Sequence, residues 1–307
     1  MRVWVQKIHR WVALVFALPL VVVLLTGLVL SFEPWLVTRS ISPGAMSLER
    51  VEALLARYDA KGQARAIAYK AYDGTLTIGG GRGGGAGTVV DVATGEARPG
   101  ASGTASFLLS ARRMHETLLL NAGWLVEAST IALLALVGLG LLMGLPRWSN
   151  SMSGWHKVTA WGLLPLVVLS PLTGLFLAWG ITFAQPRSAG GGGGGQPMPL
   201  IEAVRVVGRS HDLSGLVWLR PQGGAMLARI VEGGEYRVFQ VTREGTVTTP
   251  RNWPRLWHEG NFAGGWSALL NVVTSVALIA LLVTGLGIWQ QRRARRVRAR
   301  AARMAAA

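Results

Sequence analysis

The sequence predicts an α-helical membrane protein with four transmembrane helices from a tandem two-helix repeat, and with two small extracytoplasmic α+β lobes. Apolar runs of about 20 residues recur, and this is the length that crosses the ~30 Å hydrocarbon core of a bilayer. Composition agrees, because 50% of the residues are hydrophobic and only 15% are charged. In addition, the first apolar run and its flanking motif return later in the chain.

The repeat is clearest in the first and third apolar runs, IHRWVALVFALPLVVVLLTG and WHKVTAWGLLPLVVLSPLTG. Each begins with a histidine beside a cation, contains a proline and ends in Thr-Gly. His9 precedes Thr26 by 17 positions, and His156 precedes Thr173 by the same 17. We therefore interpret the two runs as copies of one transmembrane helix.

The second and fourth apolar runs form a looser repeat. Each is preceded by a His-Glu pair, beginning at His115 and His258, with Gly-Trp shortly after. We expect one continuous helix to carry Phe107, His115 and Ala122 on one stripe and to run on into the second span. Two units of two spans have the same orientation, so we expect an axis along the membrane normal to relate them.

These patterns divide the chain into eight segments. They are transmembrane helix 1 (1–36), a first extracytoplasmic lobe (37–103), transmembrane helix 2 with an outer extension (104–147), transmembrane helix 3 (148–184), a Gly-rich linker (185–197), a second lobe (198–252), transmembrane helix 4 with an outer extension (253–291) and a basic cytoplasmic tail (292–307).

Each lobe is predicted to contain a helix and several strands. Ser47 is the expected N-cap of a helix over 48–58, and a second amphipathic helix is expected over 199–208. Strands are expected at 64–71, 74–80, 215–221, 225–232, 235–242 and 245–250, from their β-branched and aromatic residues between turn signals. A hairpin with an Ala-Thr-Gly turn is expected over 87–97.

The distribution of charge predicts the topology. Much of the net charge of +16 lies in RRARRVRAR, directly after an apolar run, which favours contact with anionic lipid over nucleic acid. Cations at the N-terminus and in the loop before the third span place both on the cytoplasmic side. Both termini are therefore expected in the cytoplasm, and both lobes on the other side.

Histidines are the candidate ligands of a cofactor. The chain has no cysteine, which excludes disulfides, iron–sulfur clusters and covalent haem attachment. The topology places His9 and His156 at the cytoplasmic face, and His115 and His258 at the outer face. Two imidazoles on facing helices can hold a haem iron axially. Zinc or copper is the rival occupant, although two histidines are too few for a closed zinc site.

Cations flank all four histidines, and they are expected to pair with haem propionates. They are Arg10 and Lys157 at the inner face, and Arg112, Arg113 and Arg255 at the outer face. The fifth histidine, in GRSHDLSG, is expected to be a solvated turn residue.

These motifs resemble the PepSY-associated transmembrane family. The resemblance rests on His-Arg-Trp at the first span, His-Glu before the second, Trp-His-Lys at the third and Trp-His-Glu at the fourth. VVDVATGEARPG is similar to the end of a PepSY lobe, whereas VTREGTV in the second lobe lacks the Asp and Thr-Gly of that pattern.

The resemblance implies a haem-dependent oxidoreductase of the bacterial inner membrane, because the family includes di-haem reductases of ferric siderophores. We therefore expect two b-type haems, periplasmic lobes, and electron transfer to a ferric chelate or siderophore outside. The donor is expected to be a separate cytoplasmic reductase or quinol. The alternative is a non-catalytic, membrane-anchored PepSY binding or regulatory protein with structural histidines.

Overall fold

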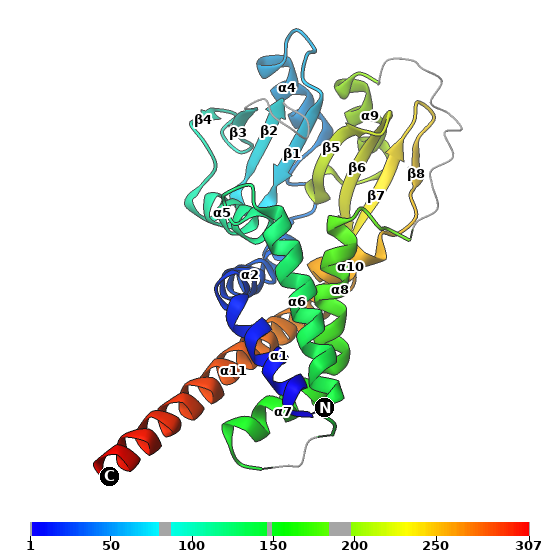
Figure 1. Ribbon diagram of the computed structural model, residues 1–307. Helices are drawn as coiled ribbons and strands as arrows, with labels where there is room; N and C mark the ends of the chain where they lie inside the picture. The colour runs from blue at the N-terminus through cyan, green and yellow to red at the C-terminus, as the bar shows by residue number, and fades with distance from the viewer. Residues whose placement is uncertain (1, 80–86, 146–148, 184–197, 307) are drawn as a thin grey trace.

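The computed structural model describes residues 2–79, 87–145, 149–183 and 198–306; the predicted linker lies outside them. It consists of a helical part and a β-sheet that caps one end of it (Figure 1). The N-terminus and α7 lie at the opposite end from the sheet, and the C-terminal end of α11 projects away from the other helices (Figure 1).

Eight strands form one antiparallel sheet in the order β4-β3-β2-β1-β5-β6-β7-β8. β1 and β5 pair at its centre, with Ile67 opposite Leu219 and Ala68 opposite Trp218. The two predicted lobes therefore share one sheet, in which the first strands of the two segments are neighbours. The strands are β1 (Ala66–Lys70), β2 (Thr75–Gly79), β3 (Thr88–Asp91), β4 (Ala97–Arg98), β5 (Leu216–Gln222), β6 (Ala225–Glu232), β7 (Glu235–Val241) and β8 (Thr246–Thr248).

Two amphipathic helices, α4 (Leu48–Tyr58) and α9 (Leu200–Ser210), pack together against this sheet. Ser47 caps α4 as predicted, because its hydroxyl accepts the backbone N–H of Arg50. Strand and helix residues of both segments form one continuous apolar core. Burying each Val, Leu or Ile side chain contributes ~1.5–3 kcal/mol, so this shared core holds the two segments together.

The first and third predicted spans are each divided into two helices. The breaks fall at repeat-equivalent residues, Phe16 and Leu163, and the helices after them contain Pro19 and Pro165 near their starts. Proline lacks an N–H and crowds the carbonyl four residues earlier, which interrupts a helix. The second break bends the chain by 68°. The four helices are α1 (Arg2–Val15), α2 (Ala17–Leu30), α7 (Met152–Gly162) and α8 (Leu164–Ala178).

Within the described residues, three helical stretches are long and apolar enough to cross a membrane. They are Ala17–Ser40, which joins α2 to α3 (Glu33–Ser40), Gly123–Leu142 (α6) and Gly265–Ala305 (α11). The bent pair α7–α8 makes a fourth if it is counted as one span. The protein is therefore helical, with three to four candidate spans and an antiparallel sheet.

The predicted continuous helix through His115 and Ala122 is wrong. α5 (Gly103–Thr117) ends before a turn in which Leu118, Leu119 and Asn121 have positive φ angles of 52°, 60° and 51°. α6 starts afresh at the Gly-Trp pair. Periodicity did not reveal the break, because leucines rarely adopt this left-handed conformation, which costs ~1–2 kcal/mol per residue. On the N-terminal side of this break, α5 packs against α2.

The second half has the same break. α10 (Trp253–Glu259) ends at Gly260, whose φ of 65° suits glycine, and α11 begins at the second Gly-Trp pair. In both halves a short helix that carries a histidine therefore lies between the sheet and a long apolar helix.

Candidate functional site

Four histidines lie in two pairs, one near the sheet and one near the far end of the helices. His115 on α5 and His258 on α10 form the sheet-side pair, with ring centroids 6.0 Å apart and ring planes at 42°. His9 on α1 and His156 on α7 form the distal pair, with centroids 6.5 Å apart and planes at 83°. Each pair joins repeat-equivalent histidines, so each spans both halves of the chain.

The sheet-side imidazoles are held from behind by the Thr-Gly ends of α2 and α8. Nδ1 of His115 lies 3.0 Å from the carbonyl oxygen of Val23 and 3.3 Å from Oγ1 of Thr26. Nδ1 of His258 lies 3.0 Å from the carbonyl oxygen of Ser170 and 3.5 Å from Oγ1 of Thr173. A carbonyl oxygen only accepts, so Nδ1 donates its proton in both rings and Nε2 keeps a free lone pair.

His156 of the distal pair uses a third Thr-Gly sequence, on α11. Its Nδ1 lies 2.8 Å from Oγ1 of Thr284, and that hydroxyl donates to the carbonyl oxygen of Ala280 at 2.6 Å. The hydroxyl oxygen therefore accepts from the imidazole. Sequence reasoning missed Thr284, although the Thr-Gly pair repeated in a third apolar run was the available signal.

Glycine after each threonine provides room for the imidazole. A Cβ atom on Gly174 would lie 2.9 Å from an imidazole carbon of His258, and one on Gly27 would lie 3.2 Å from that of His115. On Gly285 it would lie 3.5 Å from a ring carbon of His156. A side chain at the first two positions would therefore push the histidine out of place.

The spacing within each pair suits an ion held between two imidazoles. Two nitrogen–metal bonds of ~2.0 Å and the ring radius at each end add up to a centroid separation of roughly 6 Å. The observed values are 6.0 and 6.5 Å. In the described part of the chain, no group of three or more His, Asp or Glu residues is placed to hold a metal. A haem iron, which takes its other ligands from the porphyrin, fits this donor set better than zinc.

The predicted cations differ between the two ends. At the sheet side, Arg112 is paired with Glu33, and Arg255 lies 3.2 Å from Glu259. Arg113 is exposed and has no ion pair with a described residue. Arg112 and Arg255 therefore already have carboxylate partners.

At the distal end, neither cation makes an ion pair with a described residue. Arg10 lies over the ring of Trp11, 5.8 Å from its centroid, and Lys157 is exposed. A carboxylate ligand at this end would meet cations that have no protein carboxylate as partner.

Glu259 ties the sheet-side pair to the sheet. Its carboxylate accepts from Arg229 on β6 at 2.6 Å, from Arg255 at 3.2 Å and from Asn261 at 2.7 Å. Burial alone would raise the pKa of this carboxyl, but Arg229 and Arg255 outweigh it and lower the pKa to about 2. Because Glu259 directly follows His258, this ionic anchor also fixes the end of α10.

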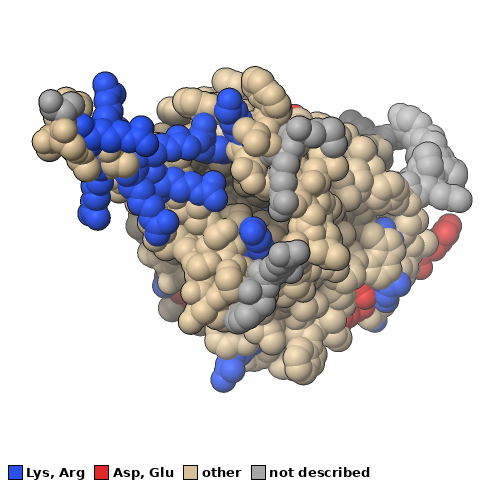
Figure 2. All heavy atoms as spheres, turned by 60° about the horizontal axis from the view of Figure 1, so that its bottom comes forward, with Lys and Arg blue, Asp and Glu red and all other residues tan. Residues whose placement is uncertain are grey.

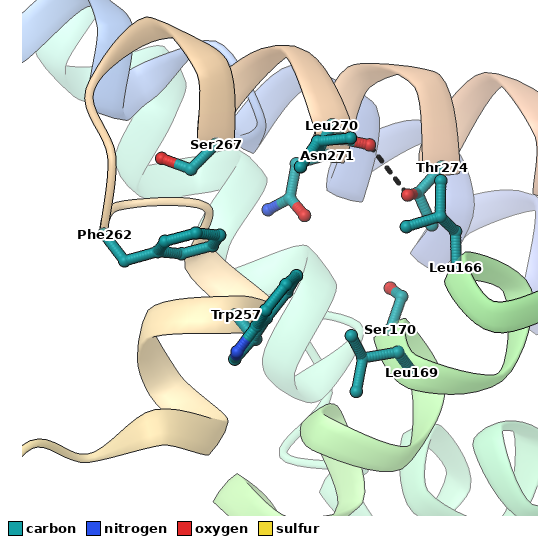
Figure 3. Close-up of a pocket in the computed structure, with 9 residues that line it drawn as sticks. All are labelled: Leu166, Leu169, Ser170, Trp257, Phe262, Ser267, Leu270, Asn271 and Thr274. Carbon is teal, nitrogen blue, oxygen red and sulfur yellow. Dashed lines mark hydrogen bonds between the residues drawn. The ribbon is translucent and has the colours of Figure 1, made fainter.

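A small pocket lies between α8, α10 and α11 (Figure 3). Trp257 and Phe262 form an aromatic wall with ring centroids 4.5 Å apart. The side chains of Ser170 and Asn271 point into it from two other helices (Figure 3). Nδ2 of Asn271 donates to the carbonyl oxygen of His258 at 2.7 Å. The pocket residues thus belong to the surroundings that hold this histidine.

The fifth histidine contradicts its prediction as a solvated turn residue. The side chain of His211 is only 9% exposed, and it is paired with Glu232. Its Nε2 lies 2.9 Å from Oγ1 of Thr246, and its ring packs on Phe239. The strands β6 to β8 enclose it, which the local sequence did not reveal.

The structure thus has three to four candidate membrane-spanning helices, a histidine pair towards each end of the helical part and a β-sheet cap, which defines the class as a membrane protein with an attached sheet domain. The chain belongs to the family described as the PepSY-associated TM region, whose model matches residues 6–292. A search among curated proteins finds no match to this chain.

Proposed function

We propose that this protein carries electrons across a membrane through two b-type haems, and that it reduces an acceptor on the side of the sheet. The observation that carries the proposal is the pair of histidines towards each end of the bundle, at ring separations of 6.0 and 6.5 Å. The hydrogen bonds at Nδ1 support it further, because they leave Nε2 of three imidazoles free for iron.

His115 and His258 would hold one haem, and His9 and His156 the other. A haem held by two imidazoles supplies one-electron, outer-sphere transfer and presents no open position to oxygen. The residues of this chain supply the rest. They fix the imidazole rings, shield them in a helical bundle, and place the two sites at different depths of a membrane.

Charge supports an orientation with the sheet outside. Figure 2 shows Lys and Arg gathered over the end of α11, on the face of the molecule that lies away from the sheet. The helices α1, which contains Lys7 and Arg10, and α7, which contains Lys157, lie at the end of the molecule away from the sheet (Figure 1). Positive residues favour the cytoplasmic side, so we place the sheet in the periplasm of a bacterial inner membrane.

The acceptor follows from this orientation. The sheet, with α4 and α9 packed against it, lies at the same end as the sheet-side pair, and Arg229 on β6 contacts Glu259 beside His258. We propose a ferric chelate, such as a ferric siderophore, as the acceptor. Electrons would enter from a cytoplasmic reductase or from quinol and pass from the distal to the sheet-side haem.

A haem assay and a difference spectrum test the proposal. Protein purified from membranes with haem supplied should contain two haems per chain and give a reduced-minus-oxidised spectrum of low-spin b-type haem. His211→Asn is the matched control, because His211 follows α9 and contacts residues of β6 to β8, and its loss should leave the haem content unchanged. A folded, colourless protein would refute the proposal and favour a non-catalytic, membrane-anchored binding protein.

A further inference from the structure

The four imidazoles are not held equally. His115 and His258 each donate from Nδ1 to a backbone carbonyl oxygen at 3.0 Å. His156 donates from Nδ1 to Oγ1 of Thr284 at 2.8 Å. The ring of His9 makes no hydrogen bond with any described residue. Three rings are therefore fixed in orientation and tautomer, and the fourth is not.

The sequence of the facing helix accounts for this difference. His9 lies on α1, and this helix packs against α6. In the second half, His156 lies on α7, and this helix packs against α11. α11 offers Thr284-Gly285, whereas the matching GLG sequence of α6 is preceded by Val137. A Cβ atom on Gly138 would meet nothing within 4 Å, so the imidazole of His9 does not lodge there. Valine has no hydroxyl to accept from Nδ1.

We infer that the distal site binds a neutral diatomic ligand, such as carbon monoxide, in exchange for His9, with His156 held in place by Thr284 as a positioning residue. This inference rests on the proposed haems. With ferrous haem bound, Nε2 of His9 would leave the iron and the carbon of the ligand would take its place. No electron would be transferred, and the released imidazole would stay neutral.

The histidines differ in the free energy that is needed to turn the imidazole ring away from the site. Turning His115 or His258 away breaks a buried Nδ1–H bond, which costs ~1–3 kcal/mol when the partners are left unpaired. Outer-sphere partners of this kind change metal affinity by roughly 10- to 100-fold. His9 has no such bond to break, and it is carried on a short helix that is separated from the next by the break at Phe16.

Carbon monoxide binding to dithionite-reduced full-length protein tests the inference. The double variant His115→Ala/His258→Ala should retain only the distal haem, and His9→Ala/His156→Ala should retain only the sheet-side haem. We expect carbon monoxide to bind the first at least ~10-fold faster than the second. His9→Ala should keep a five-coordinate distal haem on His156, whereas His156→Ala should lose it.

Variants of Thr284 test its role as the residue that positions His156. Thr284→Val should lower retention of the distal haem by ~10-fold, and Thr284→Ser, which keeps the hydroxyl, should restore it. Thr274→Val is the matched control for the distal haem, because Thr274 makes the same bond to a carbonyl four residues earlier on α11 but forms no hydrogen bond with a described histidine.

Two results would overturn the inference, namely equal carbon monoxide rates in the two double variants, or a Thr284→Val protein that behaves like Thr274→Val. Wild-type protein without haem would instead refute the proposed function, so the haem content separates the two failures.

Discussion

Replacing Glu259 with glutamine should destabilise the protein by about 3 kcal/mol at pH 7. The side chain is 20% exposed, and it lies between Arg229 and Arg255. Its pKa of about 2, against an ordinary 4.5, shows how strongly the folded state prefers the carboxylate. Each pKa unit corresponds to ~1.4 kcal/mol, which gives the figure of about 3 kcal/mol for the neutral isostere.

The effect should depend on pH with a definite sign. The pKa is lowered by folding, so the stabilisation is fully present above pH ~4.5 and is lost as the pH falls towards 2. The glutamine variant lacks this dependence. The gap in unfolding free energy between wild type and variant should therefore be constant from pH 7 to about 5 and should narrow below that.

Urea unfolding in detergent micelles, followed by tryptophan fluorescence, measures this gap. Glu116→Gln is the matched control from the first half, because its side chain is 61% exposed and lies 4.0 Å from Arg112. An exposed pair of this kind contributes less than ~1 kcal/mol. If both variants lost the same small free energy, or if the gap did not change with pH, the ionic anchor at Glu259 would have been misassigned.

Three further outcomes are expected. Alanine at either histidine of one pair should remove the low-spin signal of that haem and leave the other, as optical spectra of His258→Ala and His156→Ala would check. In stopped-flow mixing with ferric chelates of differing charge, protein without the sheet-side haem should no longer reduce the chelate, although its distal haem is still reduced; an unchanged rate would exclude the route. Replacing the arginines of 292–300 with glutamine should weaken retention of anionic over zwitterionic lipid in mixed micelles, by ~1 kcal/mol per arginine near the surface; equal retention would count against the lipid anchor.

Local sequence determined the elements and their repeat. Apolar runs of sufficient length, the prolines within them and the recurring Thr-Gly pairs were readable without any structure. The strands and the amphipathic helices α4 and α9 lie where they were predicted, because alternation and the 3.6-residue period are properties of short segments. The repeat also indicated which histidines correspond, since equivalent positions of two similar helices are expected at the same depth.

Only the tertiary structure decided what lies behind and between these residues. It showed that β1 and β5 join both segments into one sheet, because pairing between strands so far apart in the chain has no local signal. It showed that the helix ends after α5 at leucines in the left-handed conformation. It also showed that the side chain of His211 is buried.

The structure also showed that the four candidate histidines differ in their hydrogen bonds, although their sequence motifs are similar. Thr284 holds His156, whereas α6, which packs against the helix of His9, has Val137 at the matching position. His9 has no hydrogen-bond partner among the described residues. A hydrogen bond depends on which helices pack together and on their relative rotation. The packing and rotation of the helices depend on the burial of whole helix faces, so the short motif around each histidine does not predict them.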